Sequence, residues 1–445
     1  MMMTALRKTI GIYLIKNEKA LTSVILAFLC VVVLSRIIMA YSPDNCVDTH
    51  YFVETARLIL KGISPYHPET NPTPYKYPVQ SPSMSLLTMP LCFFPEAVQY
   101  LCFFICGVVT FVGLTLWVFY CYGFHVRDYI LPCWKNVPIW IVLALVFISS
   151  PFLMMLRHGQ NSTLAAICLF LVLLNPKRDN GLNMILLGLA AAVKYSLLTM
   201  QAPVLIVQKR IRLCFFSFLL FLSLVLVVGL WLDGIIPAFK EYIDLLARDM
   251  SRGANSYANA NSFSFIHVGF FKYDYLNVLL KISLVVLYLL SLLRIYIRQK
   301  NETVSASCVQ GQALSAVEWG AFTSMTLVIT YHRAYDGVLF LPFAGLVFVE
   351  LLSKLRNQLK LRVFDYFCML SLAGILLFWA MPQSFVFAFE AWFGKLFPFG
   401  RALFLYSSYP VKRYTTMFPF SKLTMLFTTY LLFAMGMFPQ KDRKG

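Results

Sequence analysis

The chain has 445 residues, of which 59% are hydrophobic and 13% are charged, and its formal net charge is +18. So few charged residues cannot cover the surface of a water-soluble globule of this length. The Lys and Arg residues lie in short clusters between apolar runs rather than on one face, which argues against a nucleic-acid partner. We therefore expect a protein that lives in membrane lipid.

Apolar runs recur along the whole chain, and most are long enough to cross a hydrocarbon layer of about 30 Å. Polar, Gly or Pro residues bound each run. We predict an all-α polytopic integral membrane protein, with residues 1–445 as a single transmembrane domain and the first run as an uncleaved anchor. The predicted spans, about 11 in number, are 20–40, 97–121, 137–156, 162–174, 182–208, 213–232, 276–297, 313–330, 337–352, 363–381 and 419–438.

The basic clusters predict the topology, because Lys and Arg are enriched in cytoplasmic loops. Lys8, Lys16 and Lys19 place the N-terminus in the cytoplasm. The other basic clusters are predicted to be cytoplasmic too: "KRDN", "KRIR", "RIYIRQK", "KLRNQLKLR" and the tail "QKDRKG". The segments left outside are 41–85, which includes an amphipathic helix, and 157–161, 233–275, 331–336 and 382–418.

The run 182–208 conflicts with a simple crossing, since basic clusters flank it on both ends. It also carries Lys194 at its centre, where a cation costs roughly 2.5–3.5 kcal/mol on a translocon scale. A re-entrant pair of short helices resolves both problems. Its tip at Lys194 would then face an external cavity, where irregular backbone at membrane depth is tolerated.

Chemically versatile residues gather at the external ends of the predicted spans. They are Asp44, Asp48, Glu54, "RHGQN" (157–161), Lys194, "NANS" (259–262) and "YHRAYD" (331–336). Ionisable residues within membrane segments are costly and mark functional sites. We predict a polar cavity that opens to the outside.

Structural roles compete with functional ones for three of these motifs. Asp48 precedes an amphipathic stretch, Thr49 to Lys61, and an Asp there is also typical of a helix N-cap. "RHGQN" can be a simple polar turn. Arg333 and Asp336 can form a structural ion pair three residues apart.

The eleven cysteines include no CxxC pair, and no His and Cys spacing is typical of a zinc site. Asp44 and Asp48 form a D-x-x-x-D pattern that can hold a divalent ion, an alternative that we do not favour. We expect no cofactor.

Several motifs together resemble the GT-C glycosyltransferases of family 87. They are the Asp in the first external loop, "KGISPYHP", "YKYPVQSP", "HGQNSTLAAICLFL", "GLAAAVKYSLL" and "YHRAYDGVLFLP", within residues 44–350. One departure is Val79 after Pro78, where the family commonly has a second proline. The resemblance implies a GT-C-like fold and an inverting enzyme that moves a sugar, a hexose such as mannose or a pentose, from a polyprenyl-phosphate donor to an envelope glycolipid or glycan. It also implies a bacterial inner membrane with the active site outside.

The resemblance and the charge pattern together suggest roles for individual residues. Asp48 would be the general base, and Lys194, His332 and Arg333 would bind the donor phosphate. The remaining candidates would line the substrate cavity: His158, Gln160, Asn161, Asn261, Tyr66 and Asp336.

Two other classes of membrane protein also use a polar cavity. A transporter of a lipid-linked or small polar solute usually has repeated broken helices and access to both faces, whereas the ionisable residues here crowd one face. An acyl- or phosphotransferase needs a nucleophile or a His–Asp dyad, for which only "HRAYD" is a candidate. The sugar and the acceptor depend on loops 63–83, 233–275 and 382–418, whose fold the sequence does not predict.

Overall fold

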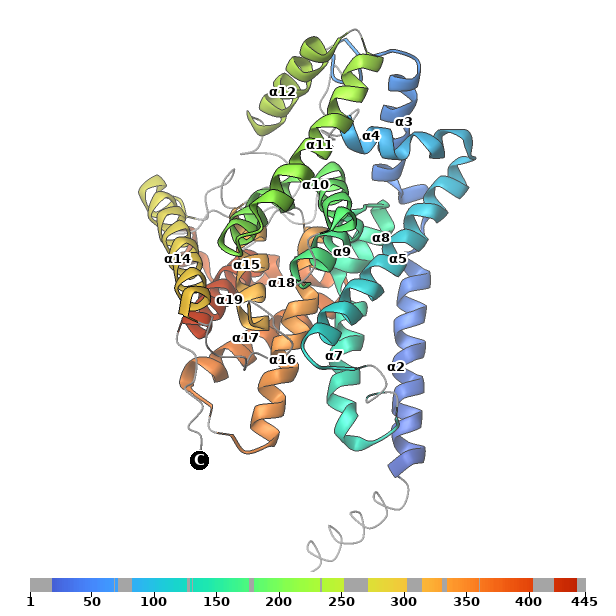
Figure 1. Cartoon of the computed structure of the whole chain (residues 1–445). Coiled ribbons are helices and arrows are strands. Elements are labelled where there is room, and N and C mark those ends of the chain that lie inside the picture. The colour runs from blue at the N-terminus through green and yellow to red at the C-terminus, as the bar shows by residue number, and fades with distance from the viewer. Residues whose placement is uncertain are drawn as a thin grey trace, which may run out of the picture.

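The computed structural model describes residues 18–67, 69–70, 82–125, 129, 131–175, 180–232, 234–251, 271–301, 314–329, 334–359, 361–402 and 420–437. Every regular element in these ranges is a helix, which confirms the all-α prediction (Figure 1). The first half contains α2 (Glu18–Ala40), η1 (Pro43–Asn45), α3 (Val47–Leu60), α4 (Pro82–Thr88), η2 (Met89–Phe93), α5 (Glu96–Cys121), η3 (Trp134–Asn136), α7 (Val137–Phe147), α8 (Ser150–His158), α9 (Ser162–Leu173) and α10 (Gly181–Val207). The second half contains α11 (Ile211–Trp231), α12 (Ile235–Ser251), α14 (Asp274–Asn301), α15 (Ala316–Ile329), η7 (Ala334–Leu339), α16 (Leu341–Arg356), α17 (Val363–Ala380), α18 (Gln383–Leu396), η8 (Pro398–Ala402) and α19 (Phe420–Met437).

Most of the long helices coincide with predicted spans, and the chain is a multi-pass membrane protein. Seven helical segments of the described ranges are long and apolar enough to cross a membrane, counting Trp134–His158 as one. α9 is shorter, at 12 residues, as its sequence predicts. The total of about 11 spans stays a prediction.

Two predicted spans differ from the helices in detail. The span 137–156 is two helices, because Ile148 and Ser149 interrupt it before Pro151, which lacks an N–H to continue the ladder. The span 337–352 was placed too early. The 3₁₀ helix η7 occupies residues 334–339, and α16 begins only at Leu341.

Contacts at the two ends of α10 show that it doubles back, as the predicted hairpin requires, while its place in the membrane stays a prediction. The backbone breaks at Lys194, with φ −154° and ψ 85°. Arg210, just past α10, donates to the carbonyl of Val172 at the end of α9 (3.0 Å), and Ser217 of α11 donates to Met184, near the start of α10 (3.2 Å). A straight helix of 27 residues would hold its ends about 40 Å apart. Both ends of α10 therefore lie at the same end of the bundle.

The outside of the bundle is apolar, as a lipid-facing surface requires. α2 stands at the edge of the bundle (Figure 1), and Val24, Phe28 and Val31 on it are each more than 60% exposed. The core instead packs aromatic rings between α9, α15 and α16, where Phe170 contacts Trp319 and Phe343 at ring-centroid distances of 5.7 and 4.9 Å.

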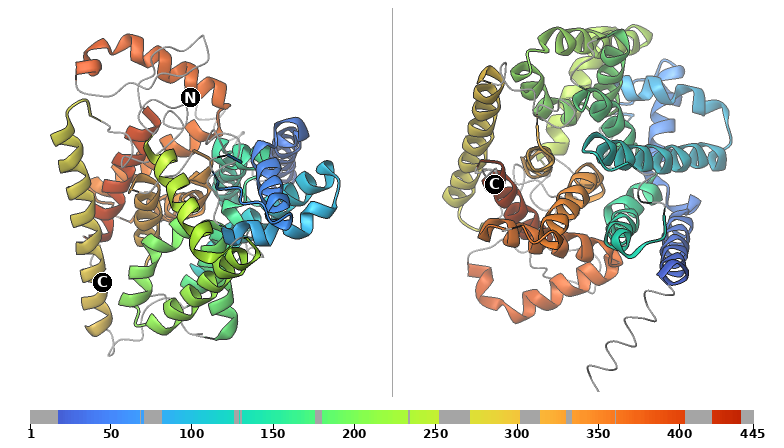
Figure 2. Two further views of the ribbon diagram at one scale, coloured as in Figure 1. Left: turned by 90° about the horizontal axis from the view of Figure 1, so that it is seen from above. Right: turned by 60° about the horizontal axis from the view of Figure 1, so that its bottom comes forward.

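Among the helices that were not predicted, α12 and α18 lie in predicted external segments. α12 lies in 233–275, at the end of the bundle that carries α3 and α4 (Figure 1). α18 lies in 382–418 and is seen along its length in the view from above (Figure 2). Both follow directly on a long apolar helix, α11 and α17 respectively.

Candidate active site

Asp48 lies in the first turn of α3 and is buried, with 8% of its surface exposed. α3 begins at Val47, and Cys46 before it makes no side-chain cap, so Asp48 is not the N-cap that the sequence allowed. Gln160 Nε2 donates to Asp48 Oδ2 over 2.6 Å. Because an ionised carboxylate can only accept, the amide must turn its NH₂ group toward Asp48. Gln160 therefore fixes one oxygen of this acid.

The turn after α8 delivers Gln160 to Asp48. Gly159 adopts a left-handed conformation (φ 68°, ψ 43°), and the amides of Gly159 and Gln160 return to the carbonyls of Leu156 and Met155. This is the Schellman pattern, which favours glycine. A Cβ on Gly159 would overlap Thr49 Oγ1, which donates to the Gly159 carbonyl at 3.2 Å. Glycine is thus needed both for the turn and for its docking on α3.

Three consecutive side chains in this turn contact three different elements. Gln160 reaches α3 at Asp48. Asn161 donates to the sulfur of Met84 in α4 (3.1 Å), and Ser162 donates to Asp336 Oδ1 in η7 (2.6 Å). Consecutive Cα atoms are about 3.8 Å apart. The carboxylates of Asp48 and Asp336 are therefore brought to neighbouring sides of a single turn.

Lys194 completes the second half of the site. Its ammonium pairs with Asp336 and donates to Ser162 Oγ at 3.2 Å. Asp336 is 2% exposed, so the cation at the hairpin tip compensates a buried acid. Ser83 of α4 donates to the Ala192 carbonyl, two residues before the tip (3.2 Å). The break in α10 is thus held from two directions.

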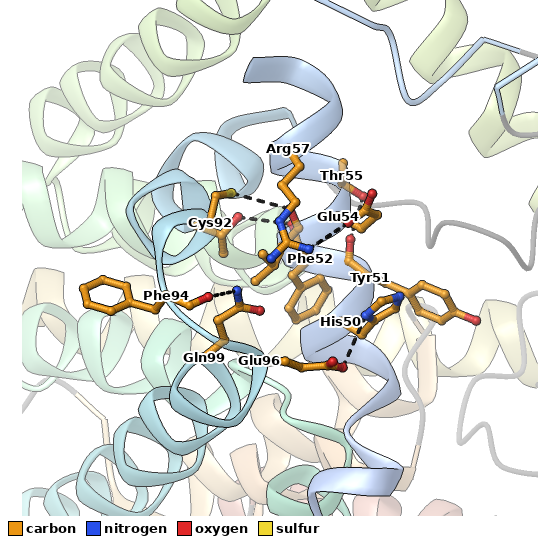
Figure 3. Close-up of polar contacts among 12 residues, drawn as sticks. His50, Tyr51, Phe52, Glu54, Thr55, Arg57, Cys92, Phe94, Glu96 and Gln99 are labelled. Carbon is orange, nitrogen blue, oxygen red and sulfur yellow. Dashed lines mark hydrogen bonds and ion pairs between the residues drawn. The ribbon is translucent and has the colours of Figure 1, made fainter. Parts of the chain in front are cut away.

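Ion pairs and a thiol contact lie on the outer flank of α3 (Figure 3). His50 lies 3.5 Å from Glu96 at the start of α5, and Arg57 lies 3.1 Å from Glu54. Cys92 of η2 lies 3.6 Å from the Val53 carbonyl. These charged groups are at least one quarter exposed. They stabilise the flank, whereas Asp48 on another face of α3 is buried.

The structure places the other predicted residues unevenly. His158 ends α8 next to the turn. Tyr66 is 1% exposed and packs edge-on against Tyr242 of α12 at a ring-centroid distance of 5.3 Å, and this burial raises the pKa of its hydroxyl. Asn261, His332 and Arg333 lie outside the described residues. The external cavity, bordered by several such segments, stays a prediction.

Sequence reasoning missed Thr49 and Ser162, although both touch the central turn. Ser162 follows "HGQN" directly and begins the short helix α9. This position beside the motif is the sequence feature that could have identified Ser162. Asp44 lies in η1, and within the described ranges no group of three His, Cys, Asp or Glu side chains gathers as in a metal site.

Comparison with known families identifies one match. The model of glycosyltransferase family 87 matches residues 76–317, which is more than half of the chain. This range includes the turn at 159–162 and Lys194, whereas Asp48 and Asp336 lie outside it. No curated protein and no solved structure matches the chain.

Proposed function

The chain belongs to glycosyltransferase family 87, and we propose that it moves a sugar from a polyprenyl-phosphate donor to an envelope glycolipid or glycan. We place the reaction on the external face of a bacterial inner membrane, with inversion at the anomeric carbon. A hexose such as mannose is the sugar that we favour, and a pentose is the alternative. Family membership favours this reaction over transport of a solute.

The contrast between two buried acids supports Asp48 as the general base. Asp336 is paired with Lys194 and accepts from Ser162. Among the described residues, Asp48 forms no ion pair and accepts a side-chain hydrogen bond only from the neutral amide of Gln160. A neighbouring cation lowers the basicity of a carboxylate. Asp48 is therefore the acid suited to take a proton from the acceptor hydroxyl.

A single base is sufficient for inversion. Retention by a double displacement uses two carboxyl groups about 5–5.5 Å apart, one of them as a nucleophile. Here the second acid, Asp336, is engaged by a cation, which favours direct attack of the acceptor hydroxyl on the anomeric carbon.

The leaving phosphate requires cations on the other side of the sugar. We assign Lys194 to this side with His332 and Arg333, because Lys194 lies across the central turn from Asp48 and because His332 and Arg333 come shortly before Asp336 in the chain. An Arg can fork onto two phosphate oxygens, while an imidazole can donate to a third as negative charge grows. The polyprenyl tail would remain in the bilayer.

The distribution of basic residues supports an external site. Arg210 lies at the far end of α9 from Ser162, and Arg356 lies at the far end of α16 from Asp336. Basic residues are enriched on the cytoplasmic side. We therefore propose that Asp48 and Lys194 lie toward the outside.

The proposal is tested by Asp48→Asn in the full chain, reconstituted in nanodiscs with polyprenyl-phosphate mannose. An amide of the same shape cannot accept the proton, so transfer should fall by roughly 10²–10⁴-fold. The matched control is Glu96→Gln, which neutralises a partly exposed acid on the outer flank of α3. It should retain activity within about twofold, as surface substitutions usually do.

Retention of more than about a tenth of the parent rate by Asp48→Asn would contradict the role of this acid, because loss of a positioned base costs more than that. Release of polyprenyl phosphate is measured alongside sugar transfer. Equal losses in both variants would contradict it too.

A further inference from the structure

A cavity of about 610 Å³ opens between α7 and α16, at the end of the bundle opposite Asp48. The segment Trp134–His158 runs from its rim to the turn at Gly159 and contains 25 residues, a path of about 35 Å when helical. α16 likewise runs from η7, which carries Asp336, to its last turn at Arg356 beside the cavity. Figure 1 shows both helices descending to the same end. The cavity is therefore separate from the candidate active site.

The cavity is lined by an apolar wall and by two cationic side chains. Its apolar wall includes Phe124, Ile139, Val349 and Leu352, and its cations are Lys135 and Arg356. No acid is among the described residues that line it.

The two cations lie on different elements of the cavity lining, and one hydrogen bond joins their residues. Arg356 NH1 donates to the backbone carbonyl of Lys135 over 3.1 Å. This hydrogen bond holds the guanidinium of α16 beside the chain that leads into α7. Both side chains are exposed, so a ligand can reach them.

We propose that this cavity binds an anionic phospholipid, with its phosphate between Lys135 and Arg356 and an acyl chain along the apolar wall. Arg and Lys are the usual partners of phosphate, and basic pockets between membrane helices on the cytoplasmic side bind anionic head groups. The volume is within the range of about 300–1,000 Å³ found for small-ligand pockets. A soluble phosphate ion would leave the apolar wall unused, which favours a lipid.

The test uses the purified full chain in phosphatidylcholine nanodiscs that carry spin-labelled phosphatidylglycerol or spin-labelled phosphatidylcholine. The motionally restricted fraction of each label gives the preference for the anionic lipid. The double variant Lys135→Gln/Arg356→Gln should lose roughly 25-fold of that preference, since each basic residue near a membrane surface contributes about 1 kcal/mol, a factor of about five.

Two further variants make the test specific. Lys240→Gln/Lys395→Gln removes two exposed cations on α12 and α18 and should leave the preference unchanged. Ser353→Trp adds bulk at an exposed lining position and should abolish the preference while both cations remain.

The proposal is overturned if the Lys135/Arg356 double variant keeps the preference, or if the control pair loses as much. It is also overturned if Ser353→Trp still restricts the anionic lipid, or if inorganic phosphate displaces that lipid at equal concentration. Thermal unfolding of each variant reports whether the fold is intact.

Discussion

Gly159 sits where the turn after α8 meets α3, and its lack of a side chain is used twice. A Cβ there would overlap Thr49 Oγ1, and the positive φ disfavours any other L-residue. The position of Gln160, and through it of Asp48, depends on this contact. A change at Gly159 should therefore affect catalysis without touching a catalytic group.

We expect Gly159→Ala to lower both the thermal stability and the transfer rate. The left-handed strain alone costs about 1 kcal/mol, and the overlap with Thr49 adds to it. Adding Thr49→Ala removes the overlapping oxygen, so the double variant should recover part of both losses. A double-mutant cycle on the unfolding midpoint and the transfer rate measures this coupling. Strictly additive losses would show that the close approach is unimportant.

At the scale of single residues, the sequence predicts which residues are candidates for function, but it does not predict which partners they contact. The cost of ionisable groups in lipid indicates "RHGQN", Lys194 and "YHRAYD" as functional. The partners follow from contacts of very long sequence separation: Gln160 with Asp48 is 112 residues apart, and Ser162 with Asp336 is 174. No local pattern contains such pairings, so the pairing of Lys194 with Asp336 could not be predicted.

Among the elements, α18 and α19 meet through a buried acid. Glu390 of α18 is 5% exposed and accepts from the amide and the hydroxyl of Ser421, at 2.8 and 2.7 Å. Burial raises the pKa of Glu390 to about 7 from its ordinary value of 4.5, against the opposing effects of the Ser421 hydrogen bonds and of the Lys422 cation. The folded protein therefore favours the protonated acid.

The sign of the resulting pH dependence follows from linkage. Between pH 4.5 and about 7 the unfolded chain gives up the Glu390 proton more readily than the folded one. This contribution to stability is complete below pH 4.5 and is lost as the pH rises to about 7. The loss is at most about 3 kcal/mol, at 1.36 kcal/mol for each pKa unit.

Glu390→Gln removes this titration. We expect the unfolding midpoint of the variant to fall less than that of the parent between pH 4.5 and 7, in detergent and at constant ionic strength. Glu241→Gln, at a half-buried acid of α12 bonded to Ser64, serves as the control and should follow the parent. Parallel curves for Glu390→Gln and the parent would refute the assignment.

Elements were predicted well where they are long and apolar, because a helix that crosses lipid must satisfy its own backbone. The hairpin of α10 was also predictable, since two basic clusters cannot flank a single crossing. α12 and α18 were not predicted, because a helix with only one apolar face leaves no continuous apolar run in the sequence. Loops 63–83, 233–275 and 382–418, which we expect to decide the choice of acceptor, likewise contain no continuous apolar run from which their fold could be predicted.

On the scale of the whole molecule, the candidate active site and the clusters of basic residues lie at opposite ends of the bundle. The candidate active site lies at one end, and the basic residues around α10, α16 and the lipid cavity lie at the other. This arrangement predicts which positions share a side of the membrane.

Thiol labelling of intact cells tests that arrangement. Cysteines introduced one at a time at Gly181, where a Cβ would meet open space, and at Arg212 should both resist a membrane-impermeant reagent. The exposed Cys30 and Cys102 are first replaced by Ser. A cysteine at Lys61, an exposed residue after α3, should react. Reaction at only one of positions 181 and 212 would contradict the hairpin, and reaction at both would place the basic end outside.

The ion pair between Lys194 and Asp336 has a consequence for how the chain is made. The two residues are 142 positions apart, and translation at about 5–20 residues per second separates their synthesis by on the order of ten seconds. During that interval the hairpin tip carries a cation whose partner has not been synthesised, at a cost of roughly 2.5–3.5 kcal/mol if it enters the bilayer centre. The hairpin must therefore wait at the translocon or in a hydrated pocket. Late arrival of η7 then allows Lys194 to pair with Asp336, so the candidate active site is assembled only after three quarters of the protein has left the ribosome.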